Sequence, residues 1–226
     1  MIDPTGMEGE KVKGVDRESA DKIHMDMNTV FADKKFDAFR GLLTRGKKNN
    51  KLTFDKISAE DFKNATSGLS GDDLDAATSV YNAINSDKEY MFEYMSGDEM
   101  SKTGNTAYKY HFNSPNSTET FSTDDIIAAG GEGLTVTSAK GIHAFIVDKP
   151  ETKHLEDCIP LTAFHEGFGH GTPLIKGVKG DNNNFNSIRY ENMIREVMEI
   201  EVKRDGTNPP HGSGGKVPNH LGKPLL

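Results

Sequence analysis

The stretch LTAFHEGFGHG at residues 161–171 constrains the fold most, because two histidines, His165 and His170, stand five positions apart within it. On a regular α-helix, at about 100° per residue, side chains five positions apart point about 140° away from each other. A π-helical turn is wider, aligns such side chains, and concentrates at functional sites. The spacing therefore predicts either a π-bulge that brings the two rings together or a glycine-rich turn in which they lie apart.

Three glycines in this stretch bear on that choice: Gly167, Gly169 and Gly171. Each weakens a regular helix by roughly 1 kcal/mol relative to alanine. A helix that served packing alone would seldom contain three of them in five residues. We therefore interpret the glycines as favouring the π-bulge.

The pattern of apolar residues along the chain favours an α+β fold with a small mixed or antiparallel sheet. Helical spacing occurs at residues 34–46, 72–95 (with a break expected near 85–87), 159–171 and 184–204. Alternation typical of strands occurs at residues 22–28, 51–58, 106–112, 133–138 and 141–148. Because the helix-rich and strand-rich regions follow one another in blocks, a doubly wound sheet is disfavoured.

Serine and asparagine residues mark the expected helix starts. Ser58 in SAED and Ser70 in SGDD have the side chain and the spacing of N-caps. Asp181, or one of the asparagines at residues 182–184, is expected to cap the helix that follows. One of these side chains could instead hold a histidine of the site in its tautomer.

Composition excludes several classes of protein. The chain has 226 residues, a formal net charge of −8 and a single cysteine, Cys158, with a mean hydropathy of −0.63. The acidic balance argues against nucleic-acid binding, which requires a basic face. One cysteine forms no intrachain disulfide, and we interpret it as a small buried apolar residue. We see neither an apolar run near 18 residues nor a signal peptide, so we expect no membrane insertion.

The residues around the two histidines fit a hydrolytic zinc site. Such a site needs three protein ligands, an open position for water and a nearby base. His165 and His170 are two candidate ligands, and Glu166 is the candidate base. Glu191 is the candidate third ligand, since it falls within the apolar stripe of residues 184–204, where a carboxylate is costly unless it is paired or bound to a metal. Pairing with Arg195 is the alternative.

Several weaker candidates complete the prediction. Glu199 is the second choice for the third ligand, and Tyr190 and His211 are candidates for stabilising an oxyanion. His211 could equally be a solvated loop residue. The segment at residues 141–148 could be a sheet edge that binds substrate by strand addition, or a strand without a substrate role.

The motif HEGFGH resembles the H-E-x-x-G-H variant of the zincin motif in the dipeptidyl peptidase III family. This resemblance implies zinc at His165, His170 and Glu191, with Glu166 polarising the attacking water. It covers the motif and the following helix only, under a quarter of the chain. Zinc-dependent hydrolysis of a protein or peptide substrate is the implied activity.

The sequence IDPTGM at residues 2–7 resembles the D-P-x-G that closes RHS-repeat (YD-repeat) cores in bacterial polymorphic toxins. That resemblance implies a toxin domain released from a larger exported bacterial protein, with an immunity protein as a possible partner. The same four residues are also ordinary turn chemistry. We expect a linker, or a strand leading into the fold, at residues 1–20, one zincin-like catalytic domain at 21–204, and an irregular tail at 205–226.

Two other functions fit the same residues. One is an α+β binding module in which His165, Glu166 and His170 are a degenerate metal site. The other is a zinc hydrolase that acts on a bond other than a peptide bond. Metal content separates the first from the enzymes, and peptide cleavage separates the second.

Overall fold

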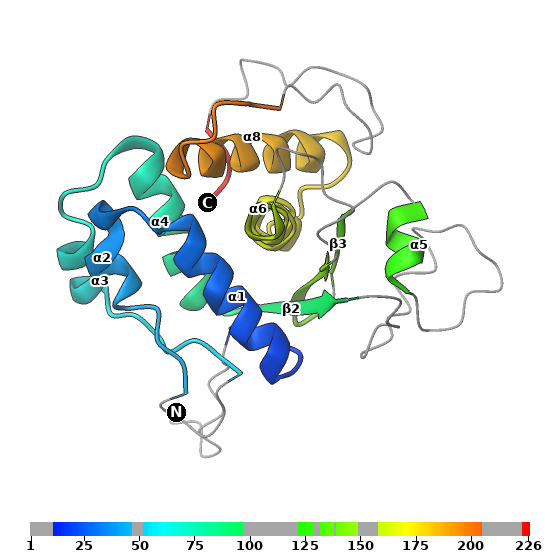
Figure 1. Cartoon of the computed structure of the whole chain (residues 1–226), viewed down its shortest axis with the longest axis horizontal. Coiled ribbons are helices and arrows are strands. Elements are labelled where there is room, and N and C mark those ends of the chain that lie inside the picture. The colour runs from blue at the N-terminus through cyan, green and yellow to red at the C-terminus, as the bar shows by residue number, and fades with distance from the viewer. Residues whose placement is uncertain are drawn as a thin grey trace.

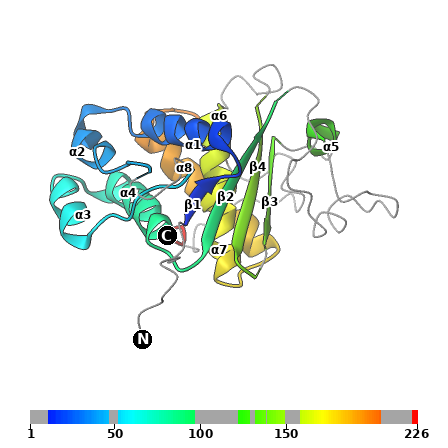
Figure 2. The same ribbon diagram turned by 90° about the horizontal axis from the view of Figure 1, so that it is seen from below.

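A computed structural model of the chain describes residues 11–46, 52–96, 122–128, 132–137, 139–148, 158–204 and 223–226. These residues form a four-stranded mixed sheet packed with helices, which confirms the expected α+β class (Figure 1). In Figure 2, α1, α4, α6 and α8 lie on one side of the sheet and α5 lies on the other. None of the helices in the described ranges is long and apolar enough to cross a membrane.

The sheet has the strand order β1-β2-β4-β3. Strands β1 (Val12–Gly14), β2 (Glu89–Met95) and β4 (Gly141–Val147) run parallel, and β3 (Gly133–Thr137) is antiparallel to β4. Every residue of β4 is buried, as expected for a strand covered on both faces. The suggestion that residues 141–148 form a sheet edge is therefore wrong. Among the described strands β3 lies at that edge, because its backbone pairs only with β4.

The expected strand at residues 22–28 is wrong, since helix α1 (Arg17–Val30) contains it. Asp16 caps the helix by accepting a hydrogen bond from the Ser19 amide at 2.8 Å. Ile23 and Met27 are buried one helical turn apart, whereas Met25 is 61% exposed. In an alternating pattern, residues four positions apart are also apolar, and that spacing fits one face of a helix. The short segment therefore did not distinguish a helix from a strand.

The second error concerns residues 72–95. Helix α4 (Gly71–Ile84) ends at the break that the sequence indicated, and β2 follows it. Tyr90, Phe92 and Tyr94 alternate along β2 and are all buried in the main core. The chain therefore changes from helical to strand periodicity, and the aromatic residues satisfied the helical pattern only by coincidence.

Smaller helices cover one end of the main core. They are a 3₁₀ turn (Lys34–Phe36), α2 (Asp37–Arg40) and α3 (Ala59–Ala65). Ser58 caps α3 by accepting from the Asp61 amide, as expected, and Ser70 precedes α4 without a side-chain cap bond. Instead of a strand at residues 51–58, Thr53 and Phe54 form two isolated β-bridges.

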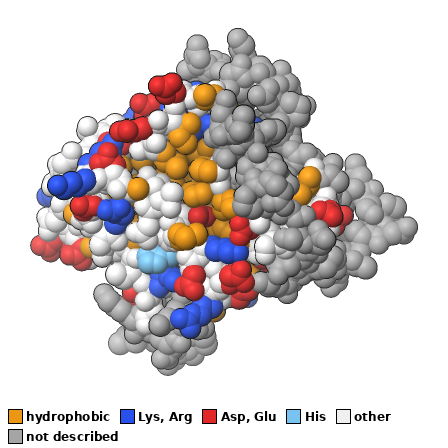
Figure 3. Space-filling view, in the orientation of Figure 1, with side chains coloured by type: hydrophobic (Ala, Val, Ile, Leu, Met, Phe, Trp, Pro, Cys, Tyr) orange, Lys and Arg blue, Asp and Glu red, His pale blue; other side chains and the backbone are white. Residues whose placement is uncertain are grey.

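The sheet separates two apolar cores. The larger core lies between the sheet and α1, α4, α6 and α8, and the smaller one lies beneath α5 (Thr123–Ala128). Members of the smaller core come from β2, β3, β4 and α5, namely Met95, Ile126, Val136, Phe145 and Val147. On the face shown in Figure 3, acidic and basic side chains of the described residues are interspersed.

The two ends of the described chain bear on the expected limits of the domain. Strand β1 and the first turn of α1 lie within residues 1–20, where we expected a linker or a strand leading into the fold. At the other end, Leu226 packs against the larger core from an irregular segment. The segments at residues 2–7 and 106–112 lie outside the described residues.

Candidate metal centre

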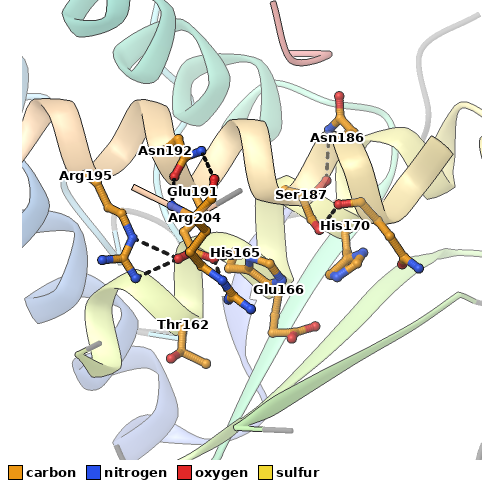
Figure 4. Close-up of polar contacts among 12 residues, drawn as sticks. Thr162, His165, Glu166, His170, Asn186, Ser187, Glu191, Asn192, Arg195 and Arg204 are labelled. Carbon is orange, nitrogen blue, oxygen red and sulfur yellow. Dashed lines mark hydrogen bonds and ion pairs between the residues drawn. The ribbon is translucent and has the colours of Figure 1, made fainter. Parts of the chain in front are cut away.

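The helix at residues 159–175 contains the predicted π-turn. It begins as α6 (Ile159–Phe164), becomes a π-helix (His165–His170) and ends as α7 (Gly171–Ile175). The Gly171 amide donates to the Glu166 carbonyl five residues earlier, which is the π-helical pattern. The His165 and His170 rings have centroids 4.8 Å apart and planes inclined by 81°. The wider turn therefore brings the two imidazoles together, as the spacing required (Figure 4).

The glycines of the π-helix have a packing role that we did not anticipate. A Cβ at Gly167 would lie 2.3 Å from Cζ of Phe92 on β2, and one at Gly169 would lie 3.2 Å from Cα of Ser187 on α8. The first contact is shorter than close-packed atoms allow, and the second is tight enough that its neighbour would have to shift. The glycines thus let the helix approach the sheet on one side and α8 on the other, so their presence alone was no evidence of a metal.

Glu166 completes a compact cluster of donors. One donor atom each from His165, Glu166 and His170 lies within 4.8 Å of the other two. Oε2 of Glu166 accepts a hydrogen bond from the Thr135 hydroxyl of β3 at 2.7 Å. Gly133 makes room for this side chain, because a Cβ there would lie 2.5 Å from Cγ of Glu166. The strand β3 therefore positions the candidate base.

Asn183 on α8 (Asp181–Val197) holds His170 through both ends of its amide. Its Nδ2 donates to the His170 carbonyl at 3.0 Å, which places Oδ1 against Nδ1 of the ring. The carbonyl oxygen of His170 only accepts hydrogen bonds, so the atom of Asn183 that faces it is the donor Nδ2. Oδ1 of Asn183 also only accepts, so Nδ1 of His170 carries the proton. In that tautomer Nε2 is the nitrogen that binds a metal.

The environment of His170 favours its neutral form. Burial lowers the pKa of His170 to about 4, against a smaller opposing effect of the Glu166 carboxylate. Only neutral imidazole binds a metal, so the ring is in its binding form at neutral pH.

Glu191 on α8 is 1% exposed and lies beside the other histidine. Its Oε2 is 2.8 Å from Nδ1 of His165 and 2.9 Å from Nη1 of Arg204, and its Oε1 is 2.8 Å from Nη2 of Arg195. Burial alone would raise the pKa of Glu191, but His165 and the two guanidinium groups outweigh it and hold the pKa at about 2. Glu191 is therefore a carboxylate at neutral pH.

The pairing of Glu191 with Arg195, which we considered as the alternative to metal ligation, is present in the structure. Glu191 also lies outside the three-residue cluster of donors, although it contacts one member of it. Its position is thus compatible with ligation after a small movement and with a supporting role. Glu199 is exposed in the turn after α8, with a φ of 58°, and is not a member of the cluster of donors.

Tyr190 does not reach the site. Its hydroxyl lies 2.6 Å from Oγ of Ser79 on α4, and the ring packs in the larger core beside Phe168. Burial raises the pKa of Tyr190 further above its ordinary range. The proposal that Tyr190 stabilises an oxyanion is wrong for this geometry. His211 lies outside the described residues.

Other polar residues near α8 also differ from expectation. Gly180, with a φ of 59°, is the N-cap of α8, so neither Asp181 nor an asparagine occupies that position. Thr135, Asn186 and Arg204 were missed altogether. Asn186 donates from Nδ2 to the Gly169 carbonyl at 3.0 Å and thereby satisfies an acceptor that the π-turn displaces. These three residues contact the site from segments that are distant in the sequence. A local sequence pattern does not predict such contacts.

His143 belongs to the opposite face of the sheet. Its Nε2 lies 3.2 Å from Oε2 of the buried Glu93, and its ring stacks on Phe145 with a centroid distance of 3.9 Å. It is therefore not a ligand at this site.

The donor set suits a divalent transition metal. Zinc prefers imidazole nitrogen and carboxylate oxygen, and both occur here on buried or partly buried side chains that neighbouring residues orient. No protein-family model, curated protein or solved structure matches the chain. The assignment of this centre therefore depends on its geometry.

Proposed function

We propose that the protein is a zinc-dependent hydrolase that cleaves peptide bonds. The observation that supports this proposal is the π-turn, which places the rings of His165 and His170 4.8 Å apart with Glu166 in the same cluster of donors. A π-turn costs regular helical hydrogen bonds and is concentrated at functional sites. Packing of the glycines explains the close approach of the helix but not the convergence of two imidazoles and a carboxylate.

In the proposed site His165 and His170 hold the metal, and Glu191 is the third ligand. Glu191 is ionised, buried and 2.8 Å from His165, which places its carboxylate beside one of the two proposed histidine ligands. Asn183 holds His170 in the tautomer that binds through Nε2. A zinc ion held there supplies Lewis acidity, which polarises a peptide carbonyl and makes a water molecule more acidic.

Glu166 is the proposed general base. The Thr135 hydroxyl holds its carboxylate at 2.7 Å, and the side chain is buried beside the two imidazoles. Glu166 accepts the proton that the attacking water loses and then donates it to the departing amine. His211 remains our candidate for stabilising the oxyanion, and it lies outside the described residues.

Metal content and cleavage test this proposal together. We expect protein purified without chelator to contain about one zinc per chain, to gain thermal stability on zinc addition, and to cleave members of a peptide library. Glu166→Gln should retain the zinc but lose cleavage by about a hundredfold or more, as expected for removal of a general base. Glu196→Gln, an exposed change on α8, is the matched control and should cleave as wild type does.

Each contrary result selects another function. Absence of zinc, with no thermal stabilisation by added zinc, would favour the non-catalytic binding module. Zinc binding without peptide cleavage would favour a hydrolase for another bond. Cleavage retained by Glu166→Gln would remove Glu166 from the role of base.

We further propose that the domain acts as a toxin delivered by a larger exported bacterial protein, with an immunity protein as its partner. The support is the DPTG sequence at residues 3–6, which lies outside the described residues. Expression of the chain in bacteria should arrest growth, whereas the Glu166→Gln variant at equal abundance should not. Equal growth with both would contradict a toxic activity of this site in the compartment tested.

A further inference from the structure

Four nitrogen atoms already surround the carboxylate of Glu191. Oε1 lies 2.9 Å from Nε and 2.8 Å from Nη2 of Arg195. Oε2 lies 2.9 Å from Nη1 of Arg204 and 2.8 Å from Nδ1 of His165 (Figure 4). A carboxylate offers about four lone-pair positions. A metal at Oε2 of Glu191 would therefore stand where Arg204 and His165 now contact that oxygen.

Arg204 is the partner that can leave. Arg195 projects from α8 and is 1% exposed, so its departure would leave a buried charge without a partner. His165 is a proposed ligand of the same metal. The Arg204 side chain is 21% exposed and belongs to the segment that returns along α8 after the helix ends. Its guanidinium group regains hydration when it moves outward.

Electrostatics favours the same exchange. A metal ion at Oε2 of Glu191 would stand close to the guanidinium of Arg204, which contacts the same oxygen. The repulsion between a divalent and a monovalent cation is twice that of two unit charges at equal separation. Metal and Arg204 therefore oppose each other at this atom, whereas without metal Arg204 compensates the carboxylate charge.

Polar contacts among the described residues fasten the returning segment at residues 202–204, which we name the latch, including an ion pair of 2.8 Å between Lys203 and the exposed Glu196. The Asn192 side chain donates to the Arg204 carbonyl at 2.7 Å and accepts from the Arg204 amide at 2.8 Å. Arg195 donates to the Val202 carbonyl at 3.3 Å, and Lys203 donates to the Asn192 carbonyl at 3.2 Å. Val202 itself is 44% exposed, so little apolar burial holds the latch in place.

We infer that a divalent metal and Arg204 compete for Glu191, so that metal binding releases the latch from α8. The inference rests on the proposed zinc site and adds its regulation. In the metal-free protein Arg204 contacts the Glu191 carboxylate, compensates its charge and so stabilises the fold. In the metal-bound protein the latch detaches from α8.

Zinc affinity of matched variants tests the competition. Arg204→Gln removes the competing charge, and Lys203→Gln removes an equal charge from the same latch without touching Glu191. Titration of zinc against a chromogenic chelator should show binding by Arg204→Gln that is about tenfold or more tighter than that of wild type. Lys203→Gln should bind within about threefold of wild type.

Hydrogen exchange in wild type tests the release without any variant. Saturating zinc should speed exchange of the Arg204 amide about tenfold or more, because its acceptor on Asn192 is lost. Exchange of the Ile194 amide within α8 should not accelerate. Wild type that binds no zinc overturns both this inference and the proposed function. Zinc binding by wild type, together with unchanged or weaker binding by Arg204→Gln or an unchanged Arg204 amide, overturns the latch alone.

Discussion

The two ends of the π-helix hold their histidines by different chemistry. His170, at the carboxyl end, contacts the neutral amide of Asn183, and Asn186 satisfies the neighbouring carbonyl. His165, at the amino end, contacts the carboxylate of Glu191, which two guanidinium groups neutralise. A neutral amide orients a ring without adding charge, whereas an ion cluster is stable only while its charges balance. In the proposed metal site, the His170 end would therefore accept an ion without change, whereas the His165 end would have to rearrange.

The largest expected effect comes from removing the Glu191 carboxylate at the His165 end of the π-helix. Glu191→Ala leaves Arg195 buried without its carboxylate, so we expect the free energy of unfolding to fall by about 3–5 kcal/mol. Urea unfolding of the metal-free protein measures this loss. Glu196→Ala, on an exposed position of the same helix, should change stability by less than about 0.5 kcal/mol. A loss below about 1 kcal/mol in Glu191→Ala would show that the cluster does not stabilise the fold.

The two ends should respond to acid in different pH ranges. The pKa of His170 is about 4 in the folded protein and near 6.5 in the unfolded chain. Between these values the unfolded chain binds more protons, so stability is present above pH 6.5 and is lost as pH falls toward 4. After discounting for the partial exposure of His170, we expect a loss of about 2–3 kcal/mol. Glu191 has a pKa of about 2, so its contribution to the free energy of unfolding is lost only as the pH falls below 4.5.

Urea unfolding at several pH values between 7 and 4.5 isolates the contribution of His170. His170→Gln should lose much of the slope that wild type shows in this range. His24, whose pKa burial also lowers, remains in both proteins and accounts for part of the residual slope. Parallel curves for wild type and His170→Gln would show that His170 is not held in its neutral form.

A smaller effect is expected from the neutral end. Asn183→Ala removes the donor to the His170 carbonyl and the acceptor at Nδ1, so we expect a loss of about 1–2 kcal/mol in metal-free protein. Asn182→Ala, an exposed neighbour in the same turn, is the control. A loss as large as that of Glu191→Ala would mean that the amide contributes as much as the ion cluster, and the contrast between the ends would disappear.

The sequence predicted this site better than it predicted the elements around it. The convergence of His165 and His170 is a local property, because five-residue spacing has a fixed meaning on a π-turn. The burial of Glu191 also followed from helical periodicity. Arg204 and Thr135 could not be foreseen, since they reach the site only when a returning segment and a sheet edge pack against it.

Errors in the fold have a common physical origin. Residues 22–28 and 89–95 are short, and each has apolar residues at every second position, so that residues four apart are also apolar, a spacing that fits a helix as well as a strand. Tertiary packing decided between them: α1 buries Ile23 and Met27 on one side, whereas β2 enters the centre of the sheet. The glycines of the π-helix were open to two explanations for a similar reason, because the sheet and α8 that approach them are distant in sequence.

The smallest expected effect separates the two ends most directly. Glu191 and Asn183 are eight residues apart on α8, about 12 Å along its axis, and they contact different histidines. In metal-free protein the unfolding energies of Glu191→Gln, Asn183→Ala and the double variant should therefore be additive within about 0.5 kcal/mol. A zinc ion held by both histidines would join the two ends, and zinc-binding free energies of the same variants should deviate from additivity by about 1 kcal/mol or more. Strong coupling without metal would mean that the π-helix itself connects the ends, and additivity with metal would mean that one ion does not bridge them.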